Sequence, residues 1–263
     1  MNNLVTNFPQ ILDFAQSYGL PLEKKRAIIR EYLQSKFITR LYAQSQSQHL
    51  SLVGGTGLRL LHNLPRFSED LDFDNLGLTK TEIIRLIKHI QSEFTRENIQ
   101  VQLKSKIKDN LAYHEFRFPN LLFDLSLTTN PREKLMIKID HTSNWTNQTP
   151  QVLLFNKYGF IEQIVTNPLS QIMVQKLAAY VHRLQTQPRD MYDLVWLYAQ
   201  GAQPDFRFIK ANKLADLINT AKIKFAHEGV TPAMLRRLRP FLFDESDVNK
   251  LKLLGEILTK LTP

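Results

Sequence analysis

The spacing of apolar residues along the chain predicts three regions of different secondary structure. Residues 21–48 carry apolar side chains at nearly helical spacing. From residue 50 to about residue 160 the pattern predicts strands with a helix among them, and after Pro168 it is helical to the end, interrupted by further prolines. We therefore expect helices first, then a sheet, then helices again.

The central region combines one helical pattern with several strand patterns. Residues 79–98 repeat apolar side chains three and four apart, as a helix does. Strands are predicted at residues 50–53, 69–73, 101–108, 112–118, 122–128 and 135–141, and later helices at 169–185, 190–200, 206–227, 231–238 and 246–261. The expected fold class is α/β (α+β): a mixed sheet with N-terminal helices and a helical C-terminal half. We place a domain boundary at Asn167–Pro168, which gives domains 1–167 and 168–263.

Composition supports a globular, cytoplasmic protein. The chain has 263 residues, of which 43% are hydrophobic, enough for one large domain or two small ones. It has no apolar run near the roughly 18 residues of a membrane helix and no secretory leader, so we expect no membrane association. Because it contains no cysteine, disulfides, thiolate nucleophiles and cysteine-ligated metal sites are excluded.

The charge balance favours polyanionic partners. The 34 basic residues exceed the 25 acidic ones, which gives a net charge of +9 and a pI of about 9.6. Proteins that bind no nucleic acid can carry a similar excess, so the charge alone leaves an RNA or DNA partner open.

A glycine turn and a pair of carboxylates are the chemical core of the sequence. Gly54, Gly55 and Thr56 follow the strand 50–53, where successive N–H groups can converge on an anion at a helix start, so a triphosphate fits there. Asp70 and Asp72 are two apart on a strand and therefore share a face, where they can hold Mg2+. Each motif alone is common, as a plain turn or a solvated strand edge, but their order indicates metal-dependent nucleotidyl transfer.

A third carboxylate is expected from a later strand. Lys138 and Asp140 share one face of the strand 135–141, and Asp140 could bind metal or accept the proton of an attacking hydroxyl. The alternative is an ordinary aspartate at a strand end. Asp124 competes for the same role, and we rank it second.

Four blocks of the chain resemble the AbiEii/AbiGii-type nucleotidyltransferase toxins, a branch of the polymerase-beta-like nucleotidyltransferase superfamily. The resemblance covers the chain from Val53 to Leu194 in the family order. Gly57 stands where the family more often has alanine or serine. The matching blocks are Gly54–Arg59 with Arg66–Phe73, then Lys138–Asp140, then Lys176–Ala178 with Arg183, and finally Arg189–Leu194.

The resemblance also assigns roles in the helical half. Lys176 takes the place of a lysine that contacts nucleotide phosphates, although a basic helix face is more often simply solvated. Asp190 is the more functional of two aspartates, and Asp193 would position Lys176 or Arg189. Alternatively, Asp190 could stabilise a helix start and Asp193 could pair with Arg189 four residues before it.

The functional hypothesis joins these residues. By resemblance, the protein would be a nucleotidyltransferase toxin that moves a nucleoside monophosphate from an NTP to RNA, expected to be the 3′ end of tRNA, and would be neutralised by a cognate antitoxin. The alternatives are a small-molecule or protein nucleotidyltransferase and a catalytically silent RNA-binding module. Arg66 and Ser68 would bind phosphate, or Arg66 would lock the carboxylates. The expected catalytic residues are Asp70, Asp72, Asp140, Lys176 and Asp190; the expected nucleotide ligands are Gly54, Gly55, Thr56, Arg66, Ser68, Lys138, Lys176 and Arg189; the expected Mg2+ ligands are Asp70, Asp72 and Asp140.

Overall fold

A computed structural model describes residues 3–108 and 111–261, and these residues form two compact units. The first, which we call the sheet unit, comprises Met1–His62, Phe67–Ser143 and Val152–Thr166. The second, the helical unit, comprises Asn63–Arg66, Asn144–Gln151 and Asn167–Pro263. The chain therefore passes more than once between the units. None of the helices in the described ranges combines the length and the apolar character needed to cross a membrane.

A five-stranded mixed sheet is the frame of the sheet unit. Its order is β1-β2-β5-β4-β3, and only β2 and β5 run parallel. This arrangement confirms the mixed sheet expected from the sequence. The strands are β1 (Leu50–Val53), β2 (Leu71–Asn75), β3 (Gln102–Lys108), β4 (Leu111–Phe118) and β5 (Leu135–Thr142).

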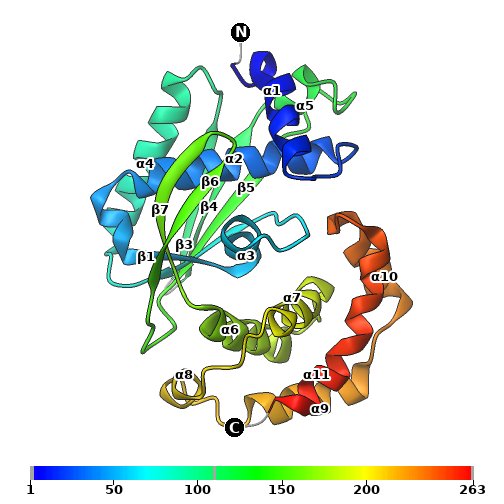
Figure 1. Ribbon diagram of the computed structural model, residues 1–263. Helices are drawn as coiled ribbons and strands as arrows, with labels where there is room; N and C mark the ends of the chain where they lie inside the picture. The colour runs from blue at the N-terminus through cyan, green and yellow to red at the C-terminus, as the bar shows by residue number, and fades with distance from the viewer. Residues whose placement is uncertain (1–2, 109–110, 262–263) are drawn as a thin grey trace. The chain divides into compact units, whose positions relative to one another are not determined.

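Two long helices cover one face of this sheet. Figure 1 shows α2 (Lys25–Tyr42) crossing the strands, and it contacts β5. The ring of Phe116 on β4 lies 5.2 Å from Phe37 of α2 and 6.0 Å from Phe94 of α4 (Lys80–Arg96). Because side chains alternate along a strand, the residues next to Phe116 face the opposite side of the sheet.

The shorter helices of the sheet unit lie at the ends of the strands or on α2. The sequence pattern did not predict the helix Asn3–Ser17, which packs on α2. They are α1 (Asn3–Ser17), the 3-10 helix η1 (Ser45–His49), α3 (Gly54–His62) and α5 (Leu121–Asp124).

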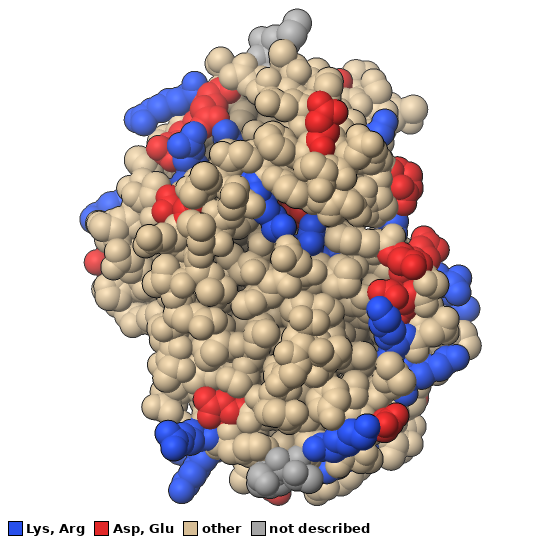
Figure 2. All heavy atoms as spheres, in the orientation of Figure 1, with Lys and Arg blue, Asp and Glu red and all other residues tan. Residues whose placement is uncertain are grey.

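A β-hairpin that the sequence did not predict completes the unit. Strands β6 (Gln151–Lys157) and β7 (Phe160–Thr166) form a two-stranded sheet, and β7 contacts α2 and β1. The two residues between them, Tyr158 and Gly159, have φ values of 55° and 77°, which suits a tight hairpin turn. Three large apolar side chains are exposed on the hairpin, and Figure 2 shows a surface over it that is largely free of charge. These side chains are Val152, Leu154 and Ile161.

The helical unit confirms the helical C-terminal half. Two of its helices begin with a proline, Pro188 and Pro232, which is favoured in the first turn. The expected helix 206–227 is two helices, because the chain turns at Lys213, whose φ is 57°. The elements are α6 (Leu169–His182), α7 (Pro188–Ala199), α8 (Phe206–Ala211), α9 (Leu217–Glu228), α10 (Pro232–Leu238), α11 (Leu254–Lys260) and the 3-10 helices η2 (Arg239–Phe241) and η3 (Glu245–Leu253).

The expected strand at residues 122–128 is wrong. Helix α5 occupies its first part, and a turn follows at Ser126, where φ is 55°. Leu121, Leu122 and Leu125 are buried, a spacing that one helical turn provides. Asp124, the second candidate for the third carboxylate, therefore lies exposed at the end of a helix rather than on a strand.

Candidate active site

The glycine turn places a carboxylate against the start of α3. Strand β1 ends at Val53 and α3 begins at Gly54, whose φ is 69°. A Cβ atom on Gly54 would lie 2.1 Å from Oδ2 of Asp72. Only glycine therefore fits here, since it adopts this backbone conformation readily and leaves room for the carboxylate.

The next two residues fix the helix start to the carboxylate strand. Gly55 and Thr56 lie buried in the first turn of α3, and the Thr56 hydroxyl donates a hydrogen bond of 2.5 Å to the backbone carbonyl of Asp70. The positive end of the helix dipole, which favours anions, is thus held next to the acidic strand.

The sheet register brings the predicted carboxylates to one face. Asp72 on β2 is the register partner of Asp140 on the parallel strand β5, and of Val53 on β1. Asp70 immediately precedes β2. Burial raises the pKa of Asp140 and the charge of Asp70 raises it further, whereas Lys138 opposes the shift. Asp70 and Asp140 therefore interact electrostatically, while Asp72 is the strand neighbour of Asp140.

Two carboxylates are a suitable protein contribution to a magnesium site. Among the described residues, no three histidine, aspartate or glutamate side chains form a group that could hold a metal ion by themselves. Mg2+ typically uses one or two carboxylates together with water and substrate phosphates. Asp72 and Asp140 fit that pattern, because oxygen donors on neighbouring strands lie next to a helix start that suits phosphate.

The segment before Asp70 is held to α2. The Gln34 side chain donates hydrogen bonds to the backbone carbonyls of Ser68 and Glu69, at 3.2 and 3.0 Å. Arg30 forms an ion pair of 3.0 Å with the Glu69 carboxylate. The predicted ligand Ser68 thus lies in a segment whose backbone is fixed just before Asp70.

Lys138 shares its sheet face with a second ion pair. Its register partner on β4 is Glu115, which accepts hydrogen bonds from Arg117 at 2.5 and 2.9 Å. Lys138 is two residues from Asp140 on β5 and therefore points to the same face.

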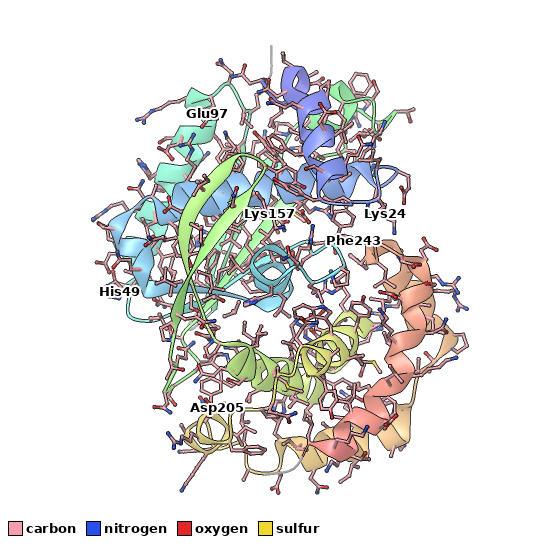
Figure 3. All side chains as sticks on the ribbon, in the orientation of Figure 1. Lys24, His49, Glu97, Lys157, Asp205 and Phe243 are labelled. Atoms are coloured by element: carbon pink, nitrogen blue, oxygen red, sulfur yellow. The ribbon has the colours of Figure 1, made fainter. Side chains whose placement is uncertain are left out.

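Arg59, within the first motif, is part of the sheet unit's interior. Its guanidinium donates to both carboxylate oxygens of Glu31, at 2.8 and 3.1 Å, and both side chains are buried. The Tyr158 hydroxyl donates to the same carboxylate at 3.1 Å. Figure 3 marks the neighbouring Lys157 at the end of β6. Arg59 therefore has a structural partner on α2.

A second buried charge network lies in the helical unit. Lys176 Nζ is 3.0 Å from Asp190 Oδ1 and 2.8 Å from Asp193 Oδ2. Arg66 donates two hydrogen bonds of 2.7 and 2.6 Å to Asp193. Arg183, which is half exposed, forms an ion pair of 2.7 Å with Asp190. Three cations thus surround two carboxylates.

This network keeps Asp193 and Lys176 ionised. Burial alone would raise the pKa of Asp193, but the charges of Arg66 and Lys176 outweigh burial and hold that pKa below its ordinary value. Burial works to lower the pKa of Lys176, but Asp193 and Asp190 raise it above its ordinary value. The Arg66 guanidinium, for which the sequence left two roles open, contacts the carboxylate of Asp193.

Arg189 has an aromatic partner. Its guanidinium carbon lies 4.3 Å from the centre of the Phe241 ring, a cation–π distance. Arg189 and Asp190 both belong to the first turn of α7.

The predicted site residues divide between the two units. The helical unit carries Arg66, Lys176, Arg189 and Asp190, and the sheet unit carries the other predicted residues.

Two residues near the carboxylates were not predicted from the sequence. Asp74 continues the alternation of Asp70 and Asp72 and is buried beside Ser51, so the alternation itself could have revealed it. Tyr113 is the β4 partner of Asp140, and no local signal could have revealed that pairing.

Comparison with known proteins gives a matching family model and similar solved structures. The sequence model of one family, described as Nucleotidyl transferase AbiEii toxin, Type IV TA system, matches residues 36–254. No curated protein is similar enough in sequence to count as a match. The structure of JHP933 from Helicobacter pylori is similar, with a TM-score of 0.52 and 20% identity over 89% of this chain and 92% of that one. A second H. pylori protein, described as a candidate nucleotidyltransferase, has a TM-score of 0.52 and 19% identity over 89% and 95% of the two chains. At such identities the likeness shows the fold, and it confirms the expected fold class.

Proposed function

This chain belongs to the AbiEii family of nucleotidyl transferase toxins of type IV toxin–antitoxin systems, and from this premise we propose that it transfers a nucleoside monophosphate from an NTP to an RNA hydroxyl. One observation carries the proposal: Asp72 lies in register with Asp140 and against Gly54 at the start of α3. Carboxylates for Mg2+ and a helix start for phosphate are thereby neighbours.

In the proposed reaction the acceptor oxygen attacks the α-phosphorus of the NTP. A new oxygen–phosphorus bond forms as the α–β bridging bond breaks, and pyrophosphate leaves in line with the attack. Asp72 and Asp140 would hold Mg2+ beside Asp70, and the ion would neutralise phosphate charge and acidify the attacking hydroxyl. Alternatively, an Asp140 that does not bind the metal could accept the proton of the attacking hydroxyl, and burial and Asp70 raise the pKa of its carboxyl group.

The remaining residues would bind the triphosphate. The backbone amides of Gly54, Gly55 and Thr56 would contact phosphate oxygens, with Ser68 and Lys138 nearby on the same unit. In the helical unit, Lys176 and Arg189 would neutralise charge on the leaving pyrophosphate, and Asp190 would orient Lys176. The ion pairs with Asp190 and Asp193 support this role, since they keep the ammonium charged although it is buried.

The proposed acceptor is the 3′ end of tRNA. The net charge of +9 favours a polyanionic acceptor, and the family resemblance suggests tRNA. A nucleotide added to that end would block aminoacylation and therefore translation, so the proposed partner is a cognate antitoxin. The reaction would take place in the cytoplasm, where NTPs and tRNA are found.

Incubation of the protein with each labelled NTP, Mg2+ and total tRNA tests the proposal. Label should appear in RNA with wild-type protein and should be lost with Asp72→Asn, which keeps the size of the side chain. Asp140→Asn should also abolish transfer, whereas the matched change Asp124→Asn, at an exposed position on α5, should not.

Other outcomes would redirect or end the proposal. Label on the protein itself would indicate protein nucleotidylation, and label on an added aminoglycoside would indicate a small-molecule enzyme. If folded wild-type protein labels nothing in the presence of Mg2+, the proposal is wrong and a silent RNA-binding module takes its place.

A further inference from the structure

The row of residues that contains the two strand carboxylates continues across the sheet. Asp140 on β5 is paired with Tyr113 on β4, and Tyr113 is paired with Lys106 on β3. Strands are about 4.8 Å apart, so Tyr113 lies one strand from Asp140 and Lys106 lies two strands away. An aromatic ring and a cation therefore follow the carboxylates in order along one face.

The adjacent row adds more cations to this face. Lys104 on β3 is paired with Glu115 on β4, and Glu115 with Lys138 on β5. Arg117 follows on β4 and contacts Glu115. We name this group the β3–β4 strip: Lys104, Lys106, Tyr113 and Arg117. Its three cations outnumber the carboxylate of Glu115, which contacts Arg117.

The β3–β4 strip lies on the side of the sheet away from α2 and α4. Phe116 contacts both helices, and strand alternation places Tyr113, Glu115 and Arg117 on the opposite face. Lys104 and Lys106 are exposed and Tyr113 is partly exposed. A ligand can therefore reach the ring and the lysines.

We propose that the β3–β4 strip binds the single-stranded 3′ end of the RNA acceptor, with a base stacked on Tyr113 and phosphates on Lys104 and Lys106. This inference rests on the proposed function. Aromatic rings that stack bases beside cations that follow the backbone are the usual surface for single-stranded nucleic acid. The three cations match such a ligand in charge.

The geometry of the reaction explains why the acceptor lies on this side. In-line displacement requires the attacking oxygen and the leaving pyrophosphate on opposite sides of the α-phosphorus. The glycine turn for the triphosphate lies on the β1 side of Asp72, and the β3–β4 strip lies on its β5 side. An acceptor strand on β4 and β3 would thus present its terminal hydroxyl to the carboxylates from the side away from the triphosphate.

Kinetics of three variants and one control test the inference. Tyr113→Ala should raise the KM for tRNA about 5- to 150-fold, the range for removal of one base stack, and leave the KM for NTP unchanged. Tyr113→Phe keeps the ring and should restore the wild-type KM. In Lys104→Ala/Lys106→Ala, the slope of log affinity against log salt should fall by about 0.7 for each phosphate that the variant no longer binds.

The control removes the same charge from the other face. Arg85 and Lys88 are exposed on α4, which packs against the face that carries Phe116. Arg85→Ala/Lys88→Ala should therefore keep the wild-type salt slope and the wild-type KM for tRNA. Thermal unfolding of each variant separates a loss of RNA binding from a loss of fold.

The outcomes distinguish this inference from the proposed function. If wild-type protein labels RNA and folded Tyr113→Ala keeps the wild-type KM for tRNA, the β3–β4 strip is not the acceptor site, although the transfer reaction stands. If Lys104→Ala/Lys106→Ala and the control Arg85→Ala/Lys88→Ala change the salt slope equally, the inference is likewise wrong. If wild-type protein labels no RNA, both proposals fail.

Discussion

Replacement of Gly54 by alanine tests how closely the helix start and the carboxylate are fitted together. The new Cβ would lie 2.1 Å from Asp72 Oδ2, 2.9 Å from its Cγ and 3.0 Å from its Cβ. Contacts of 3.4 Å are ordinary, so the carboxylate oxygen must move by about 1.3 Å, the difference between 3.4 and 2.1 Å. The backbone must also keep a φ of 69°, which an alanine adopts at a cost of about 1–2 kcal/mol.

The two effects have different sizes. A loss of about 1–2 kcal/mol lowers the melting temperature of a protein of this size by only a few degrees. A displacement of about 1 Å at a reacting centre can lower the rate about 100-fold. We therefore expect Gly54→Ala to fold and to transfer nucleotide about 100-fold more slowly than wild type.

Gly57→Ala is the matched control on the same helix. Its Cβ would meet the Leu52 carbonyl oxygen at 3.1 Å, a tight contact but not an overlap, and alanine favours a helix by about 1 kcal/mol over glycine. Label transfer to tRNA and thermal unfolding should both stay close to wild type. Full transfer activity in Gly54→Ala would refute the reasoning, because the carboxylate would then tolerate displacement.

Asp193→Asn should lower the free energy of unfolding in urea by about 3–5 kcal/mol, because Arg66 and Lys176 would keep buried charges without their shared carboxylate; a loss below about 1 kcal/mol would contradict this. Burial and a neighbouring carboxylate raise the pKa of Asp140, so at a pH between the ordinary and the raised value the folded state binds more protons than the unfolded state. The free energy of unfolding therefore falls as the pH rises through this range. Without Mg2+, Asp140→Asn should therefore be at least as stable as wild type at neutral pH and should lose this advantage at acid pH. Thermal unfolding in EDTA measures both effects, and a variant less stable than wild type at neutral pH would contradict this prediction. Mg2+ with ATP should raise the melting temperature of wild type more than that of Asp72→Asn, since a ligand stabilises the state that binds it, and equal shifts would exclude Asp72 from the binding site.

The parts of the fold that could be predicted are those with strong local signals. The Gly54–Gly55 turn after an apolar strand predicted the β1–α3 junction, and alternation predicted β5 with Asp140 and Lys138 on one face. The hairpin β6–β7 was not predicted because residues 152–155 are all apolar and so lack the alternation of apolar and polar residues that indicates a strand. At α5, leucines at 121, 122 and 125 fit a helical turn, and the short run 122–128 could be taken for a strand.

The site depends on pairings that local patterns do not contain. Arg66 and Asp193 are 127 residues apart in the sequence, so no spacing rule connects them. The pairing of Asp140 with Tyr113 depends on strand register, and a slip by one residue would turn the opposite side chains to this face. The sequence thus indicates which residue types could act, and the register decides which of them are neighbours.

The partners of each cation separate residues that looked alike in the sequence. Arg59 and Arg66 both belong to the first motif, yet each guanidinium contacts a buried carboxylate: Arg59 that of Glu31 and Arg66 that of Asp193. Removing one partner of a buried ion pair leaves the other charge buried and unpaired, which destabilises the fold. Substitution of Arg59 or Arg66 should therefore lower the free energy of unfolding before it affects binding. Lys104 and Lys106 are exposed, so their substitution leaves no buried charge without a partner. It should instead weaken RNA binding and its salt dependence. A loss of activity in Arg66 variants is therefore evidence for a phosphate contact only where the melting temperature is unchanged.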